Sequence, residues 1–335
     1  MKIYLFNTLA TGFVFTEILC RNIRVEGIVN VKAHNAGNIN EYYNYKEFCE
    51  KNGIQYLEVE SYSLKSENDK KLLMSKDIDI LVTSAWQRLI PEWLINHCNV
   101  GAIGVHGSAS GVTQGRGRSP QNWALLSGKK SFYISLFWIT TGMDDGKIID
   151  TMKFDYSMID DIAISYEKES ICIAEMLIDN INSGTIEAHY GVEQTGDAKY
   201  LPKRIASDGM IDWNRTGEEI YNFVRALTCP YPCAYTMNND VVIKVVECKY
   251  LYINSILLQK YECGEVILNS ESMAWVKCAD GIIEIRKNAN PDVSKIKQGD
   301  ILQSCDFSQQ LRQIIERHND EVGTPLSDLI LDLIK

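Results

Sequence analysis

A histidine and an aspartate each follow an apolar run of this sequence, where polar side chains at the end of a buried strand are expected. His106 ends the run Ala102–His106 and opens a glycine-rich loop, and Asp144 lies in an Asp-x-Gly turn after the run Ser131–Thr140. A His–Asp pair can polarise a carbonyl group and carry protons near neutral pH. We therefore expect these two residues to form a catalytic site. A plain solvated turn is the alternative for Asp144, because Asp-Gly is a common turn dipeptide.

The loop that follows His106, residues 107–118, contains four glycines and two arginines (GSASGVTQGRGR). Arg116 and Arg118 could hold a phosphate through charge-assisted hydrogen bonds, or they could be solvated loop charges. The loop lacks a G-x-x-x-x-G-K-[ST] string, and no G-x-G-x-x-G follows the first apolar run, so neither a P-loop nor a dinucleotide site is favoured. No Cys/His cluster has the spacing of metal ligands, so we expect no metal.

The elements that must position these residues alternate between strand-like and helix-like segments. The expected strands of the first third are Lys2–Phe6, Val25–Val31, Gln55–Val59, Ile78–Thr83 and Ala102–His106. The expected helices between them are Thr11–Arg21, Glu47–Asn52, Ser66–Ser75 and one that opens at Pro91. This rhythm predicts a doubly wound, mostly parallel α/β sheet with right-handed crossovers. Ligands of such sheets bind at the carboxyl ends of the strands.

Beyond the loop, a helical stretch starts at Trp123, and a long helix is capped by Asp160 or Asp161 and ended by Gly184. A short helix, Thr216–Leu227, has the Thr216–Glu219 spacing of a capping box. The β-prone runs after it are short, which predicts a small OB-like β-barrel. These runs are Val241–Val246, Tyr250–Ile253, Gly264–Ile267, Met273–Cys278 and Gly281–Ile285. We expect a catalytic domain over 1–200, a barrel domain over 205–300 and a partly helical tail over 301–335.

The composition is that of a globular protein, with 45% hydrophobic and 23% charged residues. The net charge of −10 argues against a broad nucleic-acid surface, which needs Lys and Arg to displace counterions, but it leaves room for a local basic patch. We expect no signal peptide and no membrane span. Ten cysteines without C-x-x-C pairs are then expected to be reduced thiols in the cytoplasm.

Five stretches in this order resemble the folate-dependent formyltransferase family, whose members formylate methionyl-tRNA or nucleotide-linked amino sugars. The family pattern is Asn-x-His, a loop, Arg-Gly-x-x-Pro and a later Asp-x-Gly. The matching stretches here are IGVHGS, GRGRSPQNWAL, GMDDGKII, IDDIAIS and KRIASDGMIDWNRTGEEIYNFVRALTCPYPCAYT. The resemblance runs from Lys2 to about Ile285 and implies the family's Rossmann-like fold, followed by its C-terminal domain.

The resemblance also implies a reaction, in which N10-formyltetrahydrofolate gives its formyl group to an amine. His106 would donate a hydrogen bond to the developing oxyanion, and Asp144 would orient or charge His106 and help move the proton that the amine loses. The residues that would contact the folate lie in two segments. They are Ala85, Trp86, Arg88, Leu89 and Ile90 in the first segment, and Asp160, Asp161 and Ile162 in the second.

The sequence departs from the family at Gly104, which stands where the family has its catalytic Asn. The loop from His106 to Pro120 is also about two residues longer and lacks the family's Leu-Leu-Pro. In the family, that Asn helps to hold the formyl oxygen as it becomes an oxyanion. Removing such a donor costs about 2.7–4 kcal/mol of transition-state stabilisation. Gly104 has no Cβ, so we expect room at this position for a substitute donor from the loop or for a water.

Four loop residues could supply that donor: Ser108, Ser110, Thr113 and Gln114. We favour Gln114 slightly, because its amide resembles that of Asn, and Asn122 on the next helix is a weaker candidate. The residues expected to contact the acceptor substrate are Ser108, Gln114, Arg116, Arg118 and Asn122.

Three functions compete. The first is formylation of a nucleotide-linked amino sugar, as in polysaccharide biosynthesis, and the similarity of RSPQNWAL to the sugar enzymes supports it together with the acidic charge. The second is methionyl-tRNA formylation, which the acidic charge makes an unlikely reading. The third is a catalytically impaired protein that keeps the folate or nucleotide-sugar pocket, and Gly104 is its support. Other amines are a further acceptor class, and a homodimer is possible.

Overall fold

The computed structural model describes residues 1–39 and 41–334, and contacts divide it into two compact units. The first unit is Met1–Arg116, Ser131–Asp155 and Tyr166–Ala198. The second unit is Gly117–Lys130, Tyr156–Ser165 and the chain from Lys199 onward. Residues 117–130 and 156–165 therefore group with the second unit, although we expected them in the first domain. The domain limits at 200 and 300 stay predictions.

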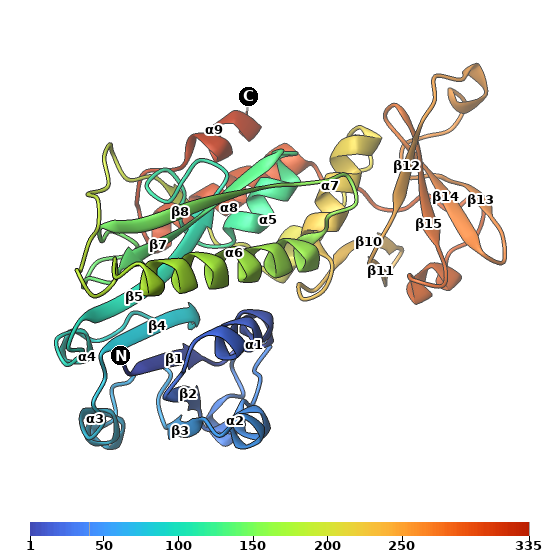
Figure 1. The fold of residues 1–335 in the computed structure, drawn as a ribbon. Helices are drawn as coiled ribbons and strands as arrows, with labels where there is room; N and C mark the ends of the chain where they lie inside the picture. Colours follow the sequence, from blue (N-terminus) through green and yellow to red (C-terminus); the bar gives the residue numbers. More distant parts are fainter. Residues whose placement is uncertain (40, 335) are drawn as a thin grey trace. The chain divides into compact units, whose positions relative to one another are not determined.

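A seven-stranded sheet forms the centre of the first unit, in the order β3-β2-β1-β4-β5-β7-β8 (Figure 1). Its strands are β1 (Ile3–Asn7), β2 (Gly27–Val31), β3 (Gln55–Val59), β4 (Ile80–Ala85), β5 (Gly101–Ser108), β7 (Ser131–Trp138) and β8 (Ile148–Asp155). The first five of these strands in chain order pair in parallel, whereas β7 and β8 are antiparallel to their neighbours. The expected mostly parallel α/β sheet is confirmed.

Helices alternate with these strands as the sequence predicts. They are α1 (Phe13–Asn22), α2 (Lys46–Asn52), α3 (Glu67–Met74), α4 (Glu92–Ile95) and the long α6 (Ile162–Asn182). The cap of α6 is Asp161, whose Oδ1 accepts a hydrogen bond from the Ile164 N–H at 2.9 Å. Gly184, with a φ of 77°, follows the end of α6 as expected.

The centre of the sheet is buried on both faces, which explains why its strands read as continuous apolar runs. Every residue of β1 is buried. Trp86, just after β4, packs edge-on against Phe6 and Tyr62, with ring centroids 5.4 Å and 4.9 Å apart. This packing anchors the segment that follows β4 at the carboxyl end of the parallel strands.

The second unit combines helices with small antiparallel sheets. Its helices are α5 (Pro120–Leu126), α7 (Gly217–Leu227), α8 (Phe307–Glu321) and α9 (Asp328–Ile334). Its strands are β9 (Tyr200–Leu201), β10 (Ala234–Asn238), β11 (Val241–Val245), β12 (Lys249–Tyr252), β13 (Val266–Asn269), β14 (Met273–Cys278) and β15 (Gly281–Arg286). β10 pairs with β11, and the other four long strands form a sheet in the order β12-β15-β14-β13. The barrel-like C-terminal region is confirmed. Helices α8 and α9 lie in the segment expected as a partly helical tail, and Lys335 lies outside the described residues.

Some elements differ from the sequence-based expectation. β8 was missed because it lies at the sheet edge, where its residues mostly alternate between part-buried and exposed, without a long apolar run. β10 was missed as well. α5 begins at Pro120 rather than Trp123, because proline suits the first helical position. β5 continues past His106 to Ser108, because pairing with β7 extends its ladder. The two-residue strand β6 (Arg116–Gly117) interrupts the predicted loop.

Candidate active site

A cavity of about 110 Å³ opens in the first unit where the parallel strands β4 and β5 end. Four of the five residues expected to contact folate in the first segment line this cavity, together with Gly104 and Asp144. Its lining residues are Thr83, Ser84, Trp86, Arg88, Leu89, Ile90, Gly104, Val105, Phe137, Ile139, Gly142 and Asp144. Six of the twelve lining residues were therefore predicted site residues, and their contact with a ligand stays a prediction.

His106 and Asp144 lie close together beside this cavity. The His106 Nδ1 is 3.6 Å from the Asp144 Oδ2, and the two side chains are 11% and 23% exposed. The other ring nitrogen, Nε2, lies 2.8 Å from the carbonyl oxygen of Gly115. A carbonyl can only accept a hydrogen bond, so Nε2 must carry a hydrogen. The neutral ring then has its free lone pair on Nδ1, the nitrogen that faces the carboxylate.

Asp144 reaches His106 by a different route from the one expected. We expected both residues to meet at a shared carboxyl edge, but β7 runs antiparallel to β5, with Trp138 opposite Ile103. The 139–144 segment must therefore return along the sheet to bring Asp144 to His106. Asp144 itself has a φ of 51°, in the left-handed region. This conformation costs a non-glycine residue about 1–3 kcal/mol and persists only where the surrounding structure determines it.

Gly104 has no spare room beside it, which corrects our expectation of a gap for a loop side chain or a water. A Cβ atom at this position would lie 2.7 Å and 2.8 Å from two ring carbons of Phe137, and 3.1 Å from Ile139. Phe137 is 4% exposed and lines the same cavity. The aromatic ring thus occupies the space that a side chain at position 104 would need.

Three of the four loop donors proposed to replace the family Asn are engaged elsewhere, and the fourth, Ser110, stays a prediction. The Ser108 hydroxyl donates to the Gly111 carbonyl at 2.6 Å, and a Cβ on Gly115 would overlap the Ser108 side chain. Thr113 Oγ1 donates to Gln194 at 2.9 Å, and Gln114 Nε2 donates to the Asp197 carbonyl at 2.9 Å. The slight preference for Gln114 as the substitute donor is therefore not supported.

The remaining substrate-binding candidates separate into buried and exposed residues. Arg116 is 8% exposed, and its Nη2 donates to Gln194 Oε1 at 2.7 Å. Asn122 is fully buried in the second unit, where its Nδ2 donates to the Ala226 carbonyl and its Oδ1 accepts from Arg204, so it serves packing and we do not propose it as a substrate contact. Arg118 is the exposed arginine of the pair and remains the candidate for a phosphate.

Backbone groups of the first folate segment are partly used by the fold. The Ala85 carbonyl accepts from the Thr8 N–H at 3.2 Å, and the Gln87 N–H donates to the Tyr62 hydroxyl at 2.8 Å. The Arg88 guanidinium stacks over the Tyr62 ring at 4.8 Å. Trp86 lines the cavity with a buried indole N–H that has no hydrogen-bond partner among residues 1–39 and 41–334. A ligand acceptor in this cavity could satisfy that donor.

The second folate segment, Asp160–Ile162, belongs to the second unit and is held by an arginine that sequence reasoning missed. Arg225 Nη1 donates to the carbonyls of Ser157 and Asp160 at 3.2 Å and 2.9 Å. The Asp160 carboxylate accepts from Ser157, Asp161 caps α6, and Ile162 is fully buried. The three side chains thus have structural partners, and their contact with folate stays a prediction.

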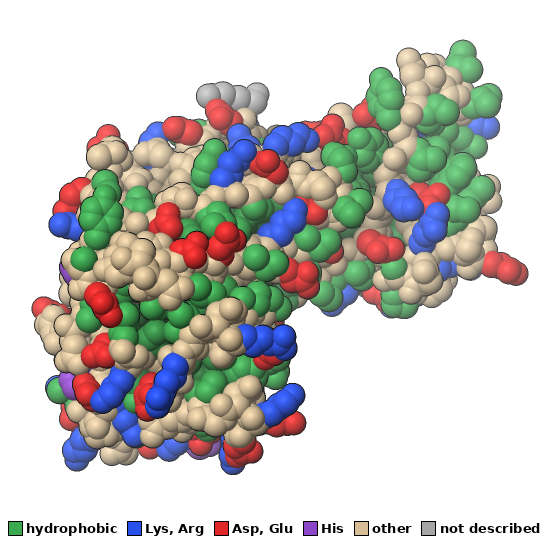
Figure 2. Space-filling model, viewed as in Figure 1, with side chains coloured by type: hydrophobic (Ala, Val, Ile, Leu, Met, Phe, Trp, Pro, Cys, Tyr) green, Lys and Arg blue, Asp and Glu red, His purple; other side chains and the backbone are tan. Residues whose placement is uncertain are grey.

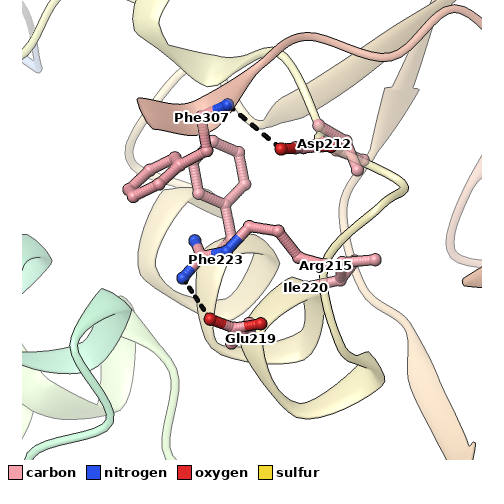
Figure 3. Close-up of a pocket in the computed structure, with 7 residues that line it drawn as sticks. Asp212, Arg215, Glu219, Ile220, Phe223 and Phe307 are labelled. Carbon is pink, nitrogen blue, oxygen red and sulfur yellow. Dashed lines mark hydrogen bonds and ion pairs between the residues drawn. The ribbon is translucent and has the colours of Figure 1, made fainter. Parts of the chain in front are cut away.

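A second cavity, in the second unit, is filled by its own side chains (Figure 3). Arg215 stacks over the Phe307 ring at 4.1 Å and pairs with Glu219 at 2.6 Å. Asp212 Oδ2 accepts from the Phe307 N–H at 3.0 Å. We interpret this cluster as packing between α7 and the start of α8.

Within residues 1–39 and 41–334, no group of His, Cys, Asp and Glu is placed to hold a metal, and no helix has the length and apolarity to cross a membrane.

Two family models match the chain. The model described as formyl transferase matches residues 27–168, and the model described as formyl transferase, C-terminal domain, matches residues 204–305. The protein belongs to the formyltransferase family.

Relatives of known sequence include methionyl-tRNA formyltransferases. One from Bacillus pumilus is 34% identical over 201 residues, which are 59% of this chain and 61% of that protein. Another, from Bacillus subtilis, is 32% identical over 60% of this chain and 62% of that protein. The matched part thus spans about three fifths of the length of these relatives.

A solved structure with the same fold is an N-formyltransferase from Helicobacter canadensis in complex with folinic acid and dTDP-3-aminofucose. It is 14% identical, covers 85% of this chain and 98% of its own, and gives a TM-score of 0.57. At this identity the similarity establishes the fold and leaves the substrate of this chain open.

Proposed function

We propose that this protein transfers a formyl group from N10-formyltetrahydrofolate to an amine. The observation that carries the proposal is the His106–Asp144 pair, 3.6 Å apart, beside a cavity lined by the Trp86–Ile90 segment. Membership of the formyltransferase family supports the same reaction. The segment that follows β4 would hold the folate ring, and the cavity would bring its formyl carbon to His106.

The geometry supports one atom as the acceptor of the proton. When a neutral amine attacks the formyl carbon, a new C–N bond forms and the amine nitrogen loses a proton. The bond between the formyl carbon and folate N10 breaks, and N10 takes up a proton and leaves as the neutral amine of tetrahydrofolate. The Nδ1 lone pair of His106 can take that proton, since Nε2 is held by Gly115. The Asp144 carboxylate then faces the imidazolium and stabilises its charge. We expected His106 to donate a hydrogen bond to the oxyanion. In this geometry it can do so from Nδ1 once Nδ1 is protonated, or from Nε2 once its hydrogen bond to Gly115 is broken.

As acceptor we propose a nucleotide-linked amino sugar. The RSPQNWAL stretch resembles the sugar enzymes, and the net charge of −10 suits a small phosphorylated substrate better than a polyanion. Arg118, exposed at the end of the loop, is the residue proposed to contact phosphate.

Methionyl-tRNA is the second candidate acceptor, because the relatives at 34% and 32% identity are methionyl-tRNA formyltransferases. Our expectation that tRNA is unlikely is not supported by these relatives. Figure 2 shows positive and negative side chains interspersed over the face in view.

The test incubates the purified protein with N10-formyltetrahydrofolate and two kinds of acceptor: a panel of amino-sugar nucleotides, and charged initiator methionyl-tRNA. Mass spectrometry of the products detects an added formyl group, and His106→Ala is the control. Formylation of a sugar nucleotide supports the proposal, and formylation of the tRNA alone replaces its acceptor. If no amine is formylated while calorimetry detects folate binding, the protein is the catalytically impaired binding protein.

A further inference from the structure

Gln194 connects the two loops on either side of His106 through a fully used amide. Its Nε2 donates to the carbonyls of Asp144 and Gly146, at 2.7 Å and 2.9 Å. Its Oε1 accepts from Thr113 Oγ1 and Arg116 Nη2, at 2.9 Å and 2.7 Å. A primary amide has two N–H groups and two lone pairs, so all four hydrogen-bonding positions of Gln194 are occupied.

The backbone around Gln194 is itself fixed to the sheet. Val192, two residues earlier, forms a bridge with Ile148 at the start of β8, and both of its backbone hydrogen bonds measure 2.8 Å. The neighbours of Gln194 in the chain are exposed, whereas the Gln194 side chain is part-buried. A side chain that turns inward from an exposed segment to meet four partners indicates a structural constraint on those partners.

On the donor side, the amide holds the turn that carries Asp144. This residue has a left-handed φ of 51°, which persists only where the surroundings determine it. The two Gln194 hydrogen bonds hold the carbonyl oxygens of Asp144 and Gly146, and so they set the direction in which the Asp144 carboxylate points. That carboxylate is the one 3.6 Å from His106 Nδ1.

On the acceptor side, the amide holds the residues that flank Gly115. Thr113 and Arg116 both donate to Gln194, and the Gly115 carbonyl between them accepts from His106 Nε2 at 2.8 Å. The Gln194 side chain therefore connects the Gly115 carbonyl, which fixes the tautomer of His106, with the Asp144 carboxylate, which faces the other ring nitrogen. Arg116 is 8% exposed and has no carboxylate partner among the described residues, so the Gln194 oxygen is the acceptor that its guanidinium contacts.

We propose that Gln194 is a positioning residue for the formyl transfer reaction, because it holds the Asp144 carboxylate and the Gly115 carbonyl in place beside the two ring nitrogens of His106. This inference rests on the proposed function. Gln194 contacts neither ring nitrogen itself. It acts through the backbone of the Asp144–Gly146 turn and through the loop that contains Thr113 and Arg116.

Two substitutions of Gln194 separate its roles. Gln194→Glu keeps the acceptors for Thr113 and Arg116 but removes both N–H donors and faces two carbonyl oxygens with a carboxylate. Gln194→Met removes all four hydrogen bonds without adding a charge, in case the first variant folds poorly. Thr195→Val is the matched control, because Thr195 is the exposed residue next to Gln194 in the chain.

The measurements are kcat and KM for formyl transfer, together with hydrogen–deuterium exchange of the peptides that cover residues 139–147 and 109–117. We expect both Gln194 variants to lose about 10²-fold in kcat, since small misplacements of catalytic groups have effects of this size, while KM stays within about twofold. Exchange in 139–147 should rise in both variants and stay unchanged in Thr195→Val. A KM increase at constant kcat would indicate a binding role and would overturn the proposal.

The exchange experiment distinguishes failure of this inference from failure of the proposed function. If the wild-type protein formylates no amine, the proposed function fails, and exchange alone tests the positioning role. Faster exchange of the Asp144 turn in Gln194→Glu than in Thr195→Val would still support it. Wild-type exchange in both Gln194 variants, or wild-type kcat in an active enzyme, would overturn it.

Discussion

The ring of Phe137 stands where a side chain at position 104 would have to begin. Its nearest carbon is 2.7 Å from the position of a Cβ atom on Gly104, a separation that real Cβ atoms do not show. Strands β5 and β7 bring the two residues together directly, since Gly104 and Phe137 are paired in the antiparallel ladder. The glycine and the phenylalanine therefore pack as one unit of the cavity wall, in which the aromatic ring takes the space beside position 104.

We predict that Gly104→Asn lowers both stability and activity, although it restores the family residue. The new side chain has to displace the Phe137 ring, and overpacking of this kind costs about 1–3 kcal/mol. Phe137→Ala alone should cost about 3–5 kcal/mol, because it removes a buried ring. The double substitution should cost clearly less than the sum of the two. Urea unfolding of all four proteins gives the coupling energy.

The rate of the double variant tests the oxyanion argument. If the site lacks an oxyanion donor, Gly104→Asn with Phe137→Ala should form product faster than Phe137→Ala alone. Additive free energies of unfolding would show that the two positions do not compete for space.

Asp144→Asn should lower kcat by about 10²–10⁴-fold, the usual contribution of a positioned acid–base group, because the neutral amide no longer stabilises the imidazolium. Asp145→Asn is the matched control. The Asp145 Oδ1 accepts from the Thr140 hydroxyl, a role that the amide oxygen of Asn can keep. Steady-state kinetics of both variants decides between the two positions. A damaging Asp145→Asn beside a harmless Asp144→Asn would move the catalytic carboxylate by one residue.

Arg225→Met should weaken folate binding through the Asp160–Ile162 segment. The substitution leaves the carbonyls of Ser157 and Asp160 without their donor, at a cost of about 1–3 kcal/mol in the free energy of unfolding. If that segment contacts folate, KM for formyltetrahydrofolate should rise with little change for the amine. Arg215→Met is the control, since Arg215 instead stacks on Phe307. Equal folate KM values in the two variants would show that the segment does not bind folate.

Stability should fall in acid partly because of Glu219 in the capping box of α7. Burial alone would raise the pKa of Glu219, but hydrogen bonds from Thr216 and the charge of Arg215 outweigh it and hold the pKa below its usual value. The unfolded state then takes up the proton more readily than the folded state. The stabilisation is therefore present above the ordinary glutamate pKa and lost as pH falls through the pKa of Glu219 in the folded protein. Glu219→Gln should therefore destabilise at pH 7 and become neutral in acid.

Urea midpoints between pH 7 and pH 3 check the acid dependence, with Glu218→Gln as the exposed neighbour for control. A constant difference between wild type and Glu219→Gln across this range would contradict the assignment.

The sequence by itself determined the order and type of most elements, because the signals for them are local. Apolar runs and caps are read within one or two turns of chain, so the expected strand Gln55–Val59 and the Thr216–Glu219 capping box appear in the structure as expected. His106 and Asp144 could be singled out for the same reason, since each follows an apolar run and carries a reactive group. Motif order identified the family and one edge of the sheet.

Only the tertiary structure decided how those residues are used. The antiparallel direction of β7 places Phe137 beside Gly104, and the loops select Nδ1 of His106 as the nitrogen that faces Asp144. Gln194 carried no signal in the sequence, because a single glutamine in a polar connection looks like solvent-exposed chain. The partners of a glycine, an amide or an imidazole are residues far away in sequence, and which of them come within 3 Å depends on how the whole sheet and its loops pack.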